Sequence, residues 1–338
     1  MYKVAVVILN WNGIRFLKDF LPGVVANSAP HKVIIADNAS TDGSADFIRT
    51  NFPQVGIIEN GANLGFTGGY NKALKEIDAE YYVLLNSDIE VTPNWVDPVI
   101  ALMESDKSIA ACQPKILDYK NKQHFEYAGA AGGYIDRLGY PYCRGRIFDT
   151  LEEDKGQYND VVDIFWATGA CMFIRAKVFH ELGGFDEDFF AHMEEIDICW
   201  RIQRAGYRIV FTPESSIYHI GGGTLPKNNA RKTYLNFRNN LTMLIKHHPL
   251  KRLIWIYPLR LVLDGVAAIK FWLAGGGFKD LKAIAKAHFY IYAHLPSILK
   301  KRVSLKTPKN IPALRTKEAK NNIIVNYYLK NKRFFSQH

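Results

Sequence analysis

The stretch Tyr81–Val91, with the sequence YYVLLNSDIEV, constrains the fold of this chain more than any other. It begins with five consecutive apolar residues, which is typical of a strand buried on both faces of a sheet. Three polar residues, Asn86, Ser87 and Asp88, follow where such a strand would emerge from the core. In an open α/β sheet, ligands bind at this carboxyl edge. A carboxylate there can hold a divalent cation and, through it, a diphosphate, although an aspartate in a simple turn gives the same pattern.

Apolar runs of strand length recur through the first 114 residues and alternate with segments of helical length. Strands are expected at Lys3–Leu9, Lys32–Ala36, Val55–Ile58, Tyr81–Leu85 and Ile109–Pro114, and helices at about Ile14–Asn27 and Asn94–Met103. This alternation predicts an α/β fold with a doubly wound, mostly parallel sheet. Polar clusters follow the strands that end at Leu9, Ala36 and Leu85. Because parallel strands end at the same edge, we expect the three clusters to lie together.

A glycine-rich segment, Asn60–Asn71 (NGANLGFTGGYN), follows the short third strand and leads into a helix. Its spacing is neither that of a dinucleotide-binding fingerprint nor that of a P-loop, so neither kind of nucleotide site is indicated. Gly65, Gly68 and Gly69 would permit close approach of the backbone to an anion at the helix N-terminus. A tight turn that requires glycine is the simpler explanation for any single one of them.

The second half of the chain brings carboxylates and a histidine to the ends of further predicted elements. These elements are an irregular loop or hairpin at Gln123–Lys155, a strand at Val161–Ile174, a helix at Arg175–Leu182, a helix at Ile198–Ala205 and a strand at Arg208–Thr212. The sequence His192–Asp197 (HMEEID) places three carboxylates directly before the second of these helices. The helix dipole accounts for part of this cluster but does not require three acids. His219 is a candidate metal ligand, although a lone histidine is more often structural.

Taken together, these motifs resemble those of the family-2 inverting glycosyltransferases. The resemblance is carried, in this order, by the segments VVILNWNG, IIADNASTDGS, NLGFTGGYN, LLNSD, GGFDEDFFAHMEEIDICWR and HIGGGT. Within the family, the chain is most similar to the rhamnosyltransferase-type enzymes of bacterial surface-polysaccharide assembly. The resemblance implies a GT-A fold, in which a nucleotide-binding α/β half is joined to an acceptor-binding half. We therefore expect a catalytic domain at residues 1–240 and a basic, helical extension at residues 241–338.

The resemblance also implies roles for individual residues, with Mn²⁺ or Mg²⁺ as the cofactor. Asp37 matches the acid that contacts the nucleoside of the donor, and Asp88 matches the last acid of the metal-binding D-x-D signature. Glu195 matches the general base, with Asp197 as a second candidate. His219 matches a position that completes the metal site in some relatives. Further donor contacts are implied within the same motifs at Asn10, Asn63, Gly65 and Asn86.

Two of these positions depart from the family pattern. Asn86 stands where the first acid of the D-x-D signature is expected, so the metal would be held with fewer protein charges. Glu195 stands where the family has an aspartate, which keeps a carboxylate but lengthens its reach by one methylene group. The assigned roles agree with the chemistry, because sugar transfer from a nucleotide diphosphate needs a cation at the leaving group and a base at the acceptor hydroxyl.

The net charge of +10 conceals two oppositely charged parts of the chain. Residues 1–226 carry 20 Lys and Arg against 30 Asp and Glu, whereas residues 227–338 carry 23 against 3. The basic part suits an anionic membrane surface or nucleic acid, but it has no RNA-binding signature. The four cysteines are far apart and indicate reduced thiols of a cytosolic protein. We expect no secretory segment, because the chain starts almost directly in a strand.

The segment Leu253–Leu273 is the strongest apolar stretch in the basic part of the chain. It is long enough to span a bilayer, but Arg260, Asp264 and Lys270 interrupt it, and Pro258 falls inside. We therefore expect an amphipathic, aromatic-bearing helix that lies on a membrane surface. A helix that only packs on the catalytic domain is the alternative.

The sequence thus predicts an inverting, metal-dependent glycosyltransferase at the cytoplasmic face of the membrane. Its partners would be a nucleotide-sugar donor, a glycan or polyprenyl-linked glycan acceptor and an anionic membrane surface, but no nucleic acid. One alternative is a nucleotidyltransferase acting on sugar phosphates, which would need a basic, glycine-rich loop after the first strand, where Asn-Trp-Asn-Gly stands instead. The other is a non-catalytic basic adaptor, which would leave Asp88 and the carboxylates at 194–197 without a role.

Overall fold

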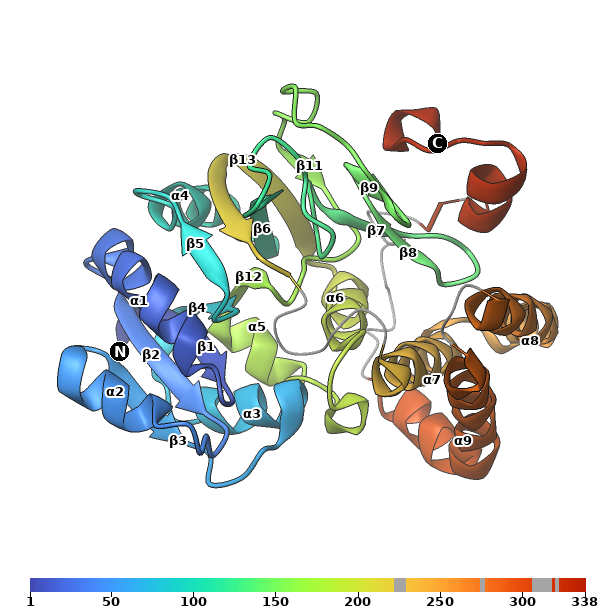
Figure 1. The fold of residues 1–338 in the computed structure, drawn as a ribbon, viewed down its shortest axis with the longest axis horizontal. Helices are drawn as coiled ribbons and strands as arrows, with labels where there is room; N and C mark the ends of the chain where they lie inside the picture. The colour runs from blue at the N-terminus through green and yellow to red at the C-terminus, as the bar shows by residue number, and fades with distance from the viewer. Residues whose placement is uncertain (222–228, 274–276, 306–317, 320–321) are drawn as a thin grey trace.

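Within the residues that the structure describes, a nine-stranded sheet forms the centre of the molecule (Figure 1). The structure is a computed structural model that describes residues 1–221, 229–273, 277–305, 318–319 and 322–338. The strands follow the order β11-β13-β6-β12-β4-β1-β2-β3, and β5 pairs with β13. Their bounds are β1 (Tyr2–Asn10), β2 (Lys32–Asp37), β3 (Gly56–Glu59), β4 (Ala79–Leu85), β5 (Ile89–Val91), β6 (Ile109–Asp118), β11 (Val162–Asp163), β12 (Cys171–Arg175) and β13 (Arg208–His219).

Most of the long strands run in one direction, which confirms the expected α/β fold. β1, β2, β3, β4, β6 and β13 share this direction, and β12 lies antiparallel between β4 and β6. In the parallel register, Asn10 lies opposite Asp37, and Ile8 lies opposite Leu85. The polar clusters that follow β1, β2 and β4 therefore meet at one edge of the sheet, as the sequence predicts.

Helices cover both faces of the sheet. One face carries α1 (Ile14–Ser28), α2 (Ser44–Asn51) and α4 (Asp97–Ser105), and the other carries α3 (Gly65–Leu74), α5 (Ala176–Glu181) and α6 (Glu194–Arg204). Val83 and Leu85 of β4 belong to the hydrophobic core under α1, α2 and α4. Tyr82 and Leu84 belong to the core under α3, α5 and α6. All four side chains are no more than 1% exposed. Burial on both faces explains why β4 is a continuous apolar run rather than an alternating one.

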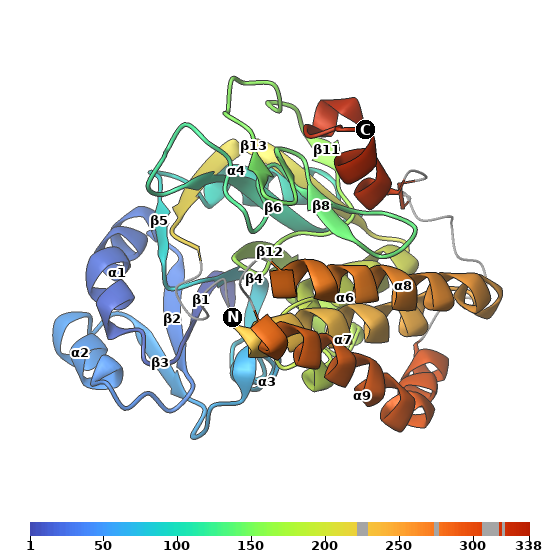
Figure 2. The ribbon, with the colours of Figure 1, turned by 45° about the vertical axis from the view of Figure 1, so that its right-hand side comes forward.

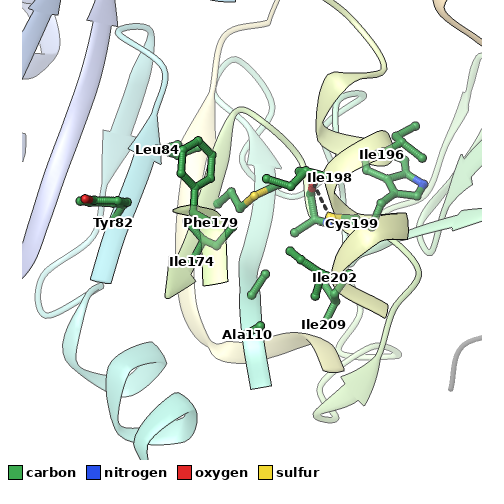
Figure 3. Close-up of a cluster of buried hydrophobic side chains, with 14 of the residues drawn as sticks. Tyr82, Leu84, Ala110, Ile174, Phe179, Ile196, Ile198, Cys199, Ile202 and Ile209 are labelled. Atoms are coloured by element: carbon green, nitrogen blue, oxygen red, sulfur yellow. Dashed lines mark hydrogen bonds between the residues drawn. The ribbon is translucent and has the colours of Figure 1, made fainter. Parts of the chain in front are cut away.

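Helix α6 is fixed to the sheet by its apolar face. Ile198, Cys199 and Ile202 of α6 lie against Ala110 of β6 and Ile209 of β13 (Figure 3). Each is fully buried or nearly so, and burial of an aliphatic side chain of this size contributes about 1.5–3 kcal/mol. The position of α6 relative to the sheet edge is therefore set by packing.

Several elements differ in extent from the sequence prediction. Helix α6 begins at Glu194 rather than at Ile198, so the three carboxylates lie inside its first turn instead of before it. Strands β6 and β13 are longer than expected because they pair in parallel along their length, which places His219 at a strand end. The expected strand at Val161–Ile174 is divided, and only β11 and β12 form within it.

A second, smaller sheet forms in the described residues where the sequence predicted an irregular loop or hairpin. It is antiparallel and consists of β7 (Gly133–Ile135), β8 (Pro141–Cys143), β9 (Arg146–Ile147) and β10 (Thr150–Leu151). The strands are short, and no alternating pattern marked them in the sequence.

Three long helices follow the central sheet. They are α7 (Ala230–His247), α8 (Leu250–Phe271) and α9 (Gly277–Ser304), followed by the short helical segments Val325–Leu329 and Phe335–Gln337. In both views α7, α8 and α9 lie together on the side of α6, away from α1 and α2 (Figures 1 and 2). Helix α7 runs continuously across residue 240, so the division expected there stays a prediction.

Helix α8 turns two of its charged residues, Arg260 and Asp264, inward, whereas Lys270 is exposed. Its buried residues are Ile256, Arg260, Asp264 and Ala268, spaced by four along one face. Arg260 and Asp264 form an ion pair of 3.1 Å between Nε and Oδ1, and His288 of α9 lies 3.2 Å from the other carboxylate oxygen. Burial alone would raise the pKa of Asp264, but Arg260 and His288 hold it below its usual value.

The opposite face of α8 is apolar and exposed. We call it the outer face of α8 and define it by Ile254, Trp255, Leu261, Val262, Val266 and Ile269. Their exposed fractions lie between 45% and 77%. Among the described residues, no helix has the length and apolar character needed to cross a membrane. A helix thus forms where the sequence predicted one; Arg260 and Asp264 pair inside the protein, Lys270 is exposed, and the apolar residues face outward. Its placement on a membrane surface stays a prediction.

We predict that Arg260→Met destabilises the protein by about 3–5 kcal/mol, because it leaves the Asp264 carboxylate buried without its main partner. The double variant Arg260→Met with Asp264→Leu is expected to recover much of this loss, because both charges are then absent. Denaturant unfolding monitored by circular dichroism measures both effects. A double variant that is as unstable as the single one would contradict the explanation.

Candidate active site

The ends of β1 and β2 form a closed polar cluster around Asp37. Asn10 Nδ2 donates to Asp37 Oδ2 at 2.9 Å, and Ser40 donates to both carboxylate oxygens at 2.7 Å. Asn10 and Asp37 are buried. A carboxylate has about four acceptor positions, so these contacts leave capacity for a ligand. The Oδ1 atom of Asn10 is buried and has no hydrogen-bond partner within the described residues, which makes it available to a donor group from a ligand.

The glycine-rich segment makes contacts within the protein. Asn63 is exposed, and its Oδ1 accepts from the backbone N–H of Gly65 at 3.0 Å. The next two amides of α3 donate to the carbonyl oxygen of Phe190, at 2.7 and 3.2 Å. A Cβ atom at Gly65 would lie 2.6 Å from the Phe190 ring. The close packing against Phe190 explains why a glycine is required at position 65. The expected donor contacts of Asn63 and Gly65 stay predictions.

The residues after β4 meet the end of β13. Asp88 Oδ1 lies 3.1 Å from Nε2 of His219, and the Asn86 side-chain amide lies 3.4 Å from the same nitrogen. Asp88 and His219 are buried. Although 131 residues separate them, β5 pairs with β13 antiparallel and brings Ile89 opposite His219.

A third group, Glu126, completes this cluster and was not singled out from the sequence. Its Oε2 lies 3.3 Å from Nδ1 of His219, on the side of the ring away from Asp88. Burial alone would lower the pKa of His219, but the charges of Glu126 and Asp88 outweigh it and raise the pKa to about 10. Glu126 lies in the irregular segment that gave no pattern, so no sequence signal could have found it.

The geometry of Asp88 and His219 is compatible with a divalent cation, which would take the place of the Nε2 proton of His219. Ligand atoms in cis positions about 2.1 Å from one ion lie about 3 Å apart, close to the 3.1 Å observed. The Asn86 amide could add a carbonyl oxygen after a flip of its side chain. In the part of the chain that the structure describes, no group of three or more His, Cys, Asp or Glu side chains is arranged as a metal site. Further ligands would therefore be substrate oxygens and water.

The first turn of α6 carries two carboxylates in unusual environments. Burial raises the pKa of Glu195 to about 7, although backbone hydrogen bonds oppose the shift. Burial and the neighbouring Glu195 charge raise the pKa of Glu194 well above its usual value. The Oε2 atoms of both residues are buried without a hydrogen-bond partner in the described residues. A carboxylate with a pKa near 7 is suited to general-base catalysis at neutral pH.

Asp197, the second candidate base, lies in a different environment. It is fully buried and contacts Arg201 at 3.0 Å, Lys246 at 2.7 Å and His247 at 2.8 Å. Burial alone would raise its pKa, but Lys246, Arg201 and His247 hold it well below the usual value. These contacts indicate that Asp197 is a structural anion that joins α6 to α7.

The segment that leads into α6 is held in an uncommon backbone conformation. Phe190, His192 and Met193 all have positive φ angles, between 62° and 71°. The side-chain amide of Asn239 on α7 donates to the carbonyl oxygens of Phe189, Ala191 and His192 at 2.7–3.0 Å. Such strain persists only where surrounding contacts enforce it. Helix α7 therefore stabilises the turn that precedes Glu195. The sequence did not indicate this role of Asn239, because Asn239 lies in the interior of a helix.

The described architecture is that of a GT-A glycosyltransferase, and two solved structures show the same fold. One is GalNAc-T7 with UDP, GalNAc and Mn²⁺, with a TM-score of 0.56 and 17% identity over 72% of this chain and 48% of that one. The other is a mannosyltransferase from Pyrobaculum calidifontis in complex with GDP-Man and Mn²⁺, with a TM-score of 0.51 and 14% identity over 90% of this chain and 85% of that one.

The family follows from the sequence comparison. Residues 5–183 match the family described as glycosyl transferase family 2, which is more than half of the chain. The protein therefore belongs to glycosyltransferase family 2. It is 25% identical over 284 residues to an N-acetylglucosaminyl-diphospho-decaprenol L-rhamnosyltransferase of Mycobacterium tuberculosis, covering 79% of this chain and 91% of that protein. Membership of this family does not support a nucleotidyltransferase or a non-catalytic adaptor.

We predict that Glu195→Gln lowers kcat by about two to four orders of magnitude while donor affinity stays unchanged, because an amide keeps the shape but accepts no proton. In the wild-type enzyme, kcat/KM is expected to fall as the pH drops below about 7, because a base with a raised pKa is then protonated. Initial rates of nucleotide release between pH 5.5 and 9 measure both.

The matched control is Glu181→Gln, which removes an exposed carboxylate of α5 that lies 3.8 Å from Lys177. We expect it to leave the rate unchanged. Asp197→Asn is expected to lower the unfolding midpoint, because it weakens two buried ion pairs, with Arg201 and Lys246, and a hydrogen bond with His247. A stable Asp197→Asn enzyme with a large loss of kcat, together with an active Glu195→Gln enzyme, would reassign the base to Asp197.

Proposed function

We propose that the protein transfers a sugar from a nucleotide-diphosphate sugar to a hydroxyl group of a lipid-linked glycan, with inversion at the anomeric carbon, in cell-surface polysaccharide synthesis. The observation that carries the proposal is the pairing of a candidate cation site, Asp88 and His219, with a candidate base, Glu195, whose pKa is about 7. The rhamnosyltransferase activity named for the mycobacterial relative favours a deoxyhexose donor and a polyprenyl-diphosphate-linked acceptor.

Each residue of the cluster has a distinct part in the proposed reaction. Asp88 and His219, with Asn86, would hold Mn²⁺ or Mg²⁺, and the cation would neutralise the charge that develops on the diphosphate leaving group. Asp37 and Asn10 would bind the nucleoside end of the donor through their remaining acceptor positions. Glu195 would take the proton from the attacking hydroxyl group, which is a poor nucleophile while protonated.

The electrostatic environment supports a single reaction centre. Burial raises the pKa of the Cys143 thiol, Arg146 opposes the shift, and the charges of Glu126 and Glu195 add to it. Glu126 in turn contacts His219 of the candidate cation site. Glu126, which contacts the candidate cation site, and Glu195, the candidate base, therefore both lie near Cys143, although they belong to different elements.

We further propose that the enzyme works at the cytoplasmic face of the membrane and binds it through the outer face of α8. The support is the combination of an exposed apolar helix face with a chain segment, residues 227–338, that carries 23 Lys and Arg against 3 acids. Aromatic and aliphatic side chains can enter the interface, while Lys and Arg add about 1 kcal/mol each near an anionic surface. A lipid-linked acceptor would be presented at this surface.

We predict that Asp88→Ala abolishes transfer and removes the Mn²⁺-dependent part of donor binding. Calorimetric titration with nucleoside diphosphates, with Mn²⁺ and with EDTA, measures the binding. Product formation is followed with a panel of nucleotide sugars and a short-chain polyprenyl-diphosphate-linked sugar acceptor. Donor binding that is equally strong with EDTA and in Asp88→Ala would argue against a metal-assisted reaction. Absence of any sugar transfer by the wild-type enzyme across the panel would refute the proposed substrates.

We predict that wild-type protein sediments with vesicles that contain acidic phospholipid, and that the binding falls but does not vanish as salt rises. The double variant Ile254→Glu with Val262→Glu is expected to lose most of the salt-insensitive part, because it places charges on the outer face of α8. Val161→Glu is the matched control, since Val161 is 47% exposed but belongs to the central part of the chain. Vesicle binding that is unaffected by the α8 variant would rule out this face as the contact.

A further inference from the structure

One buried guanidinium, that of Arg146, has no anionic partner in the part of the chain described by the structure. Arg146 lies on β9 and is 7% exposed. Its Nη2 donates to the Cys143 sulfur at 3.2 Å, and its guanidinium carbon lies 4.5 Å from the centre of the Tyr127 ring. Its Nε is buried, and no described residue forms a hydrogen bond with it. A thiol and an aromatic face are weak substitutes for a carboxylate.

The neighbouring Arg144 shows what a structural arginine looks like in the same hairpin. It is equally buried at 7%, but it forms an ion pair with Asp160 and stacks on the ring of Tyr158 at 4.6 Å. Burial of a cation costs several kcal/mol unless an anion compensates for it. Arg144 has its anion inside the protein. Arg146 forms no ion pair within the described residues. Burial alone would lower its pKa, but Cys143, Tyr127 and the charge of Glu126 raise it, so the guanidinium stays charged and its unpaired Nε is available to an anionic ligand.

Contacts connect Arg146 to the candidate active site. The Tyr127 ring lies beside its guanidinium, and Tyr127 follows Glu126 directly in the chain. Glu126 lies 3.3 Å from His219, which lies 3.1 Å from Asp88. Cys143, the hydrogen-bond partner of Arg146, is the thiol on which the charges of Glu126 and Glu195 act. Arg146 is therefore close to the groups to which the reaction is assigned.

We propose that Arg146 binds a phosphate group of a substrate. A planar guanidinium offers two parallel N–H donors to phosphate oxygens, and this geometry makes arginine a strong ligand for phosphate. The inference rests on the proposed function, which brings two diphosphates to the site. One belongs to the nucleotide sugar, and the other links the acceptor glycan to its lipid.

Equilibrium binding to full-length protein tests this assignment. The probes are inorganic diphosphate with EDTA, the nucleoside diphosphates UDP, GDP and dTDP with Mn²⁺, and geranyl diphosphate with EDTA as a substitute for the acceptor. Each is titrated by calorimetry at constant ionic strength into wild type, Arg146→Met, Arg146→Lys and Arg144→Met. Thermal unfolding of each variant without ligand is measured alongside.

We expect Arg146→Met to bind at least one of these diphosphates about tenfold more weakly or worse, with Arg146→Lys in between because it keeps the charge but loses the planar fork. Loss confined to the nucleoside diphosphates assigns the site to the donor, and loss confined to geranyl diphosphate assigns it to the acceptor. Arg144→Met is expected to bind all probes like wild type.

Stability without ligand separates this role from a structural one. Arg146→Met is expected to unfold at or above the wild-type midpoint, because it removes a buried charge that forms no ion pair with a described residue, whereas Arg144→Met, which breaks the ion pair with Asp160, is expected to unfold at a lower temperature. Wild-type affinity of Arg146→Met for every probe would overturn the proposal, and so would its failure to fold. Lack of binding of any nucleoside diphosphate to wild type would instead contradict the proposed function.

Discussion

The buried anion Asp197 is the interaction on which the arrangement of this enzyme depends. Its carboxylate is fully buried and contacts Lys246 and His247 of α7 as well as Arg201 of α6. Lys246 also contacts Asp186 at 2.7 Å. Since a charge taken out of water must be paired, α6 and α7 can pack only when these groups meet. Helix α6, which carries Glu195, is thereby joined to α7 in the part of the chain that is rich in Lys and Arg.

Pairing of buried charges also explains the orientation of α8. Arg260 and Asp264 satisfy one another inside the protein, with His288 and the hydroxyl group of Tyr140 as further partners. Because Arg260 and Asp264 face inward, the apolar residues on the other side of the helix face outward. An exposed apolar face of this kind is typical of an interaction surface. The same surface lies in the part of the chain with the excess of Lys and Arg.

Two carboxylates of the candidate site differ because their surroundings differ. Glu195 has few compensating groups, so burial dominates and its pKa rises to about 7. Asp197, two residues later on the same helix, faces three cationic or hydrogen-bonding groups and is held ionised. A helix turns by about 100° per residue, so two residues in one turn can face different surroundings. The proposed division between Glu195 as base and Asp197 as structural anion rests on this difference.

The sequence by itself determined the elements and their shared edge. Runs such as Tyr81–Leu85 must be buried strands, and parallel strands must bring Asp37 and Asp88 to one side of the sheet. The ordered motifs also determined the glycosyltransferase family. Only the tertiary structure decided that Glu126 contacts His219, that α6 begins at Glu194 and that Arg260 and Asp264 of α8 point inward. Each of these depends on partners that are distant in the chain, and local periodicity shows which residues share a face but not what that face meets.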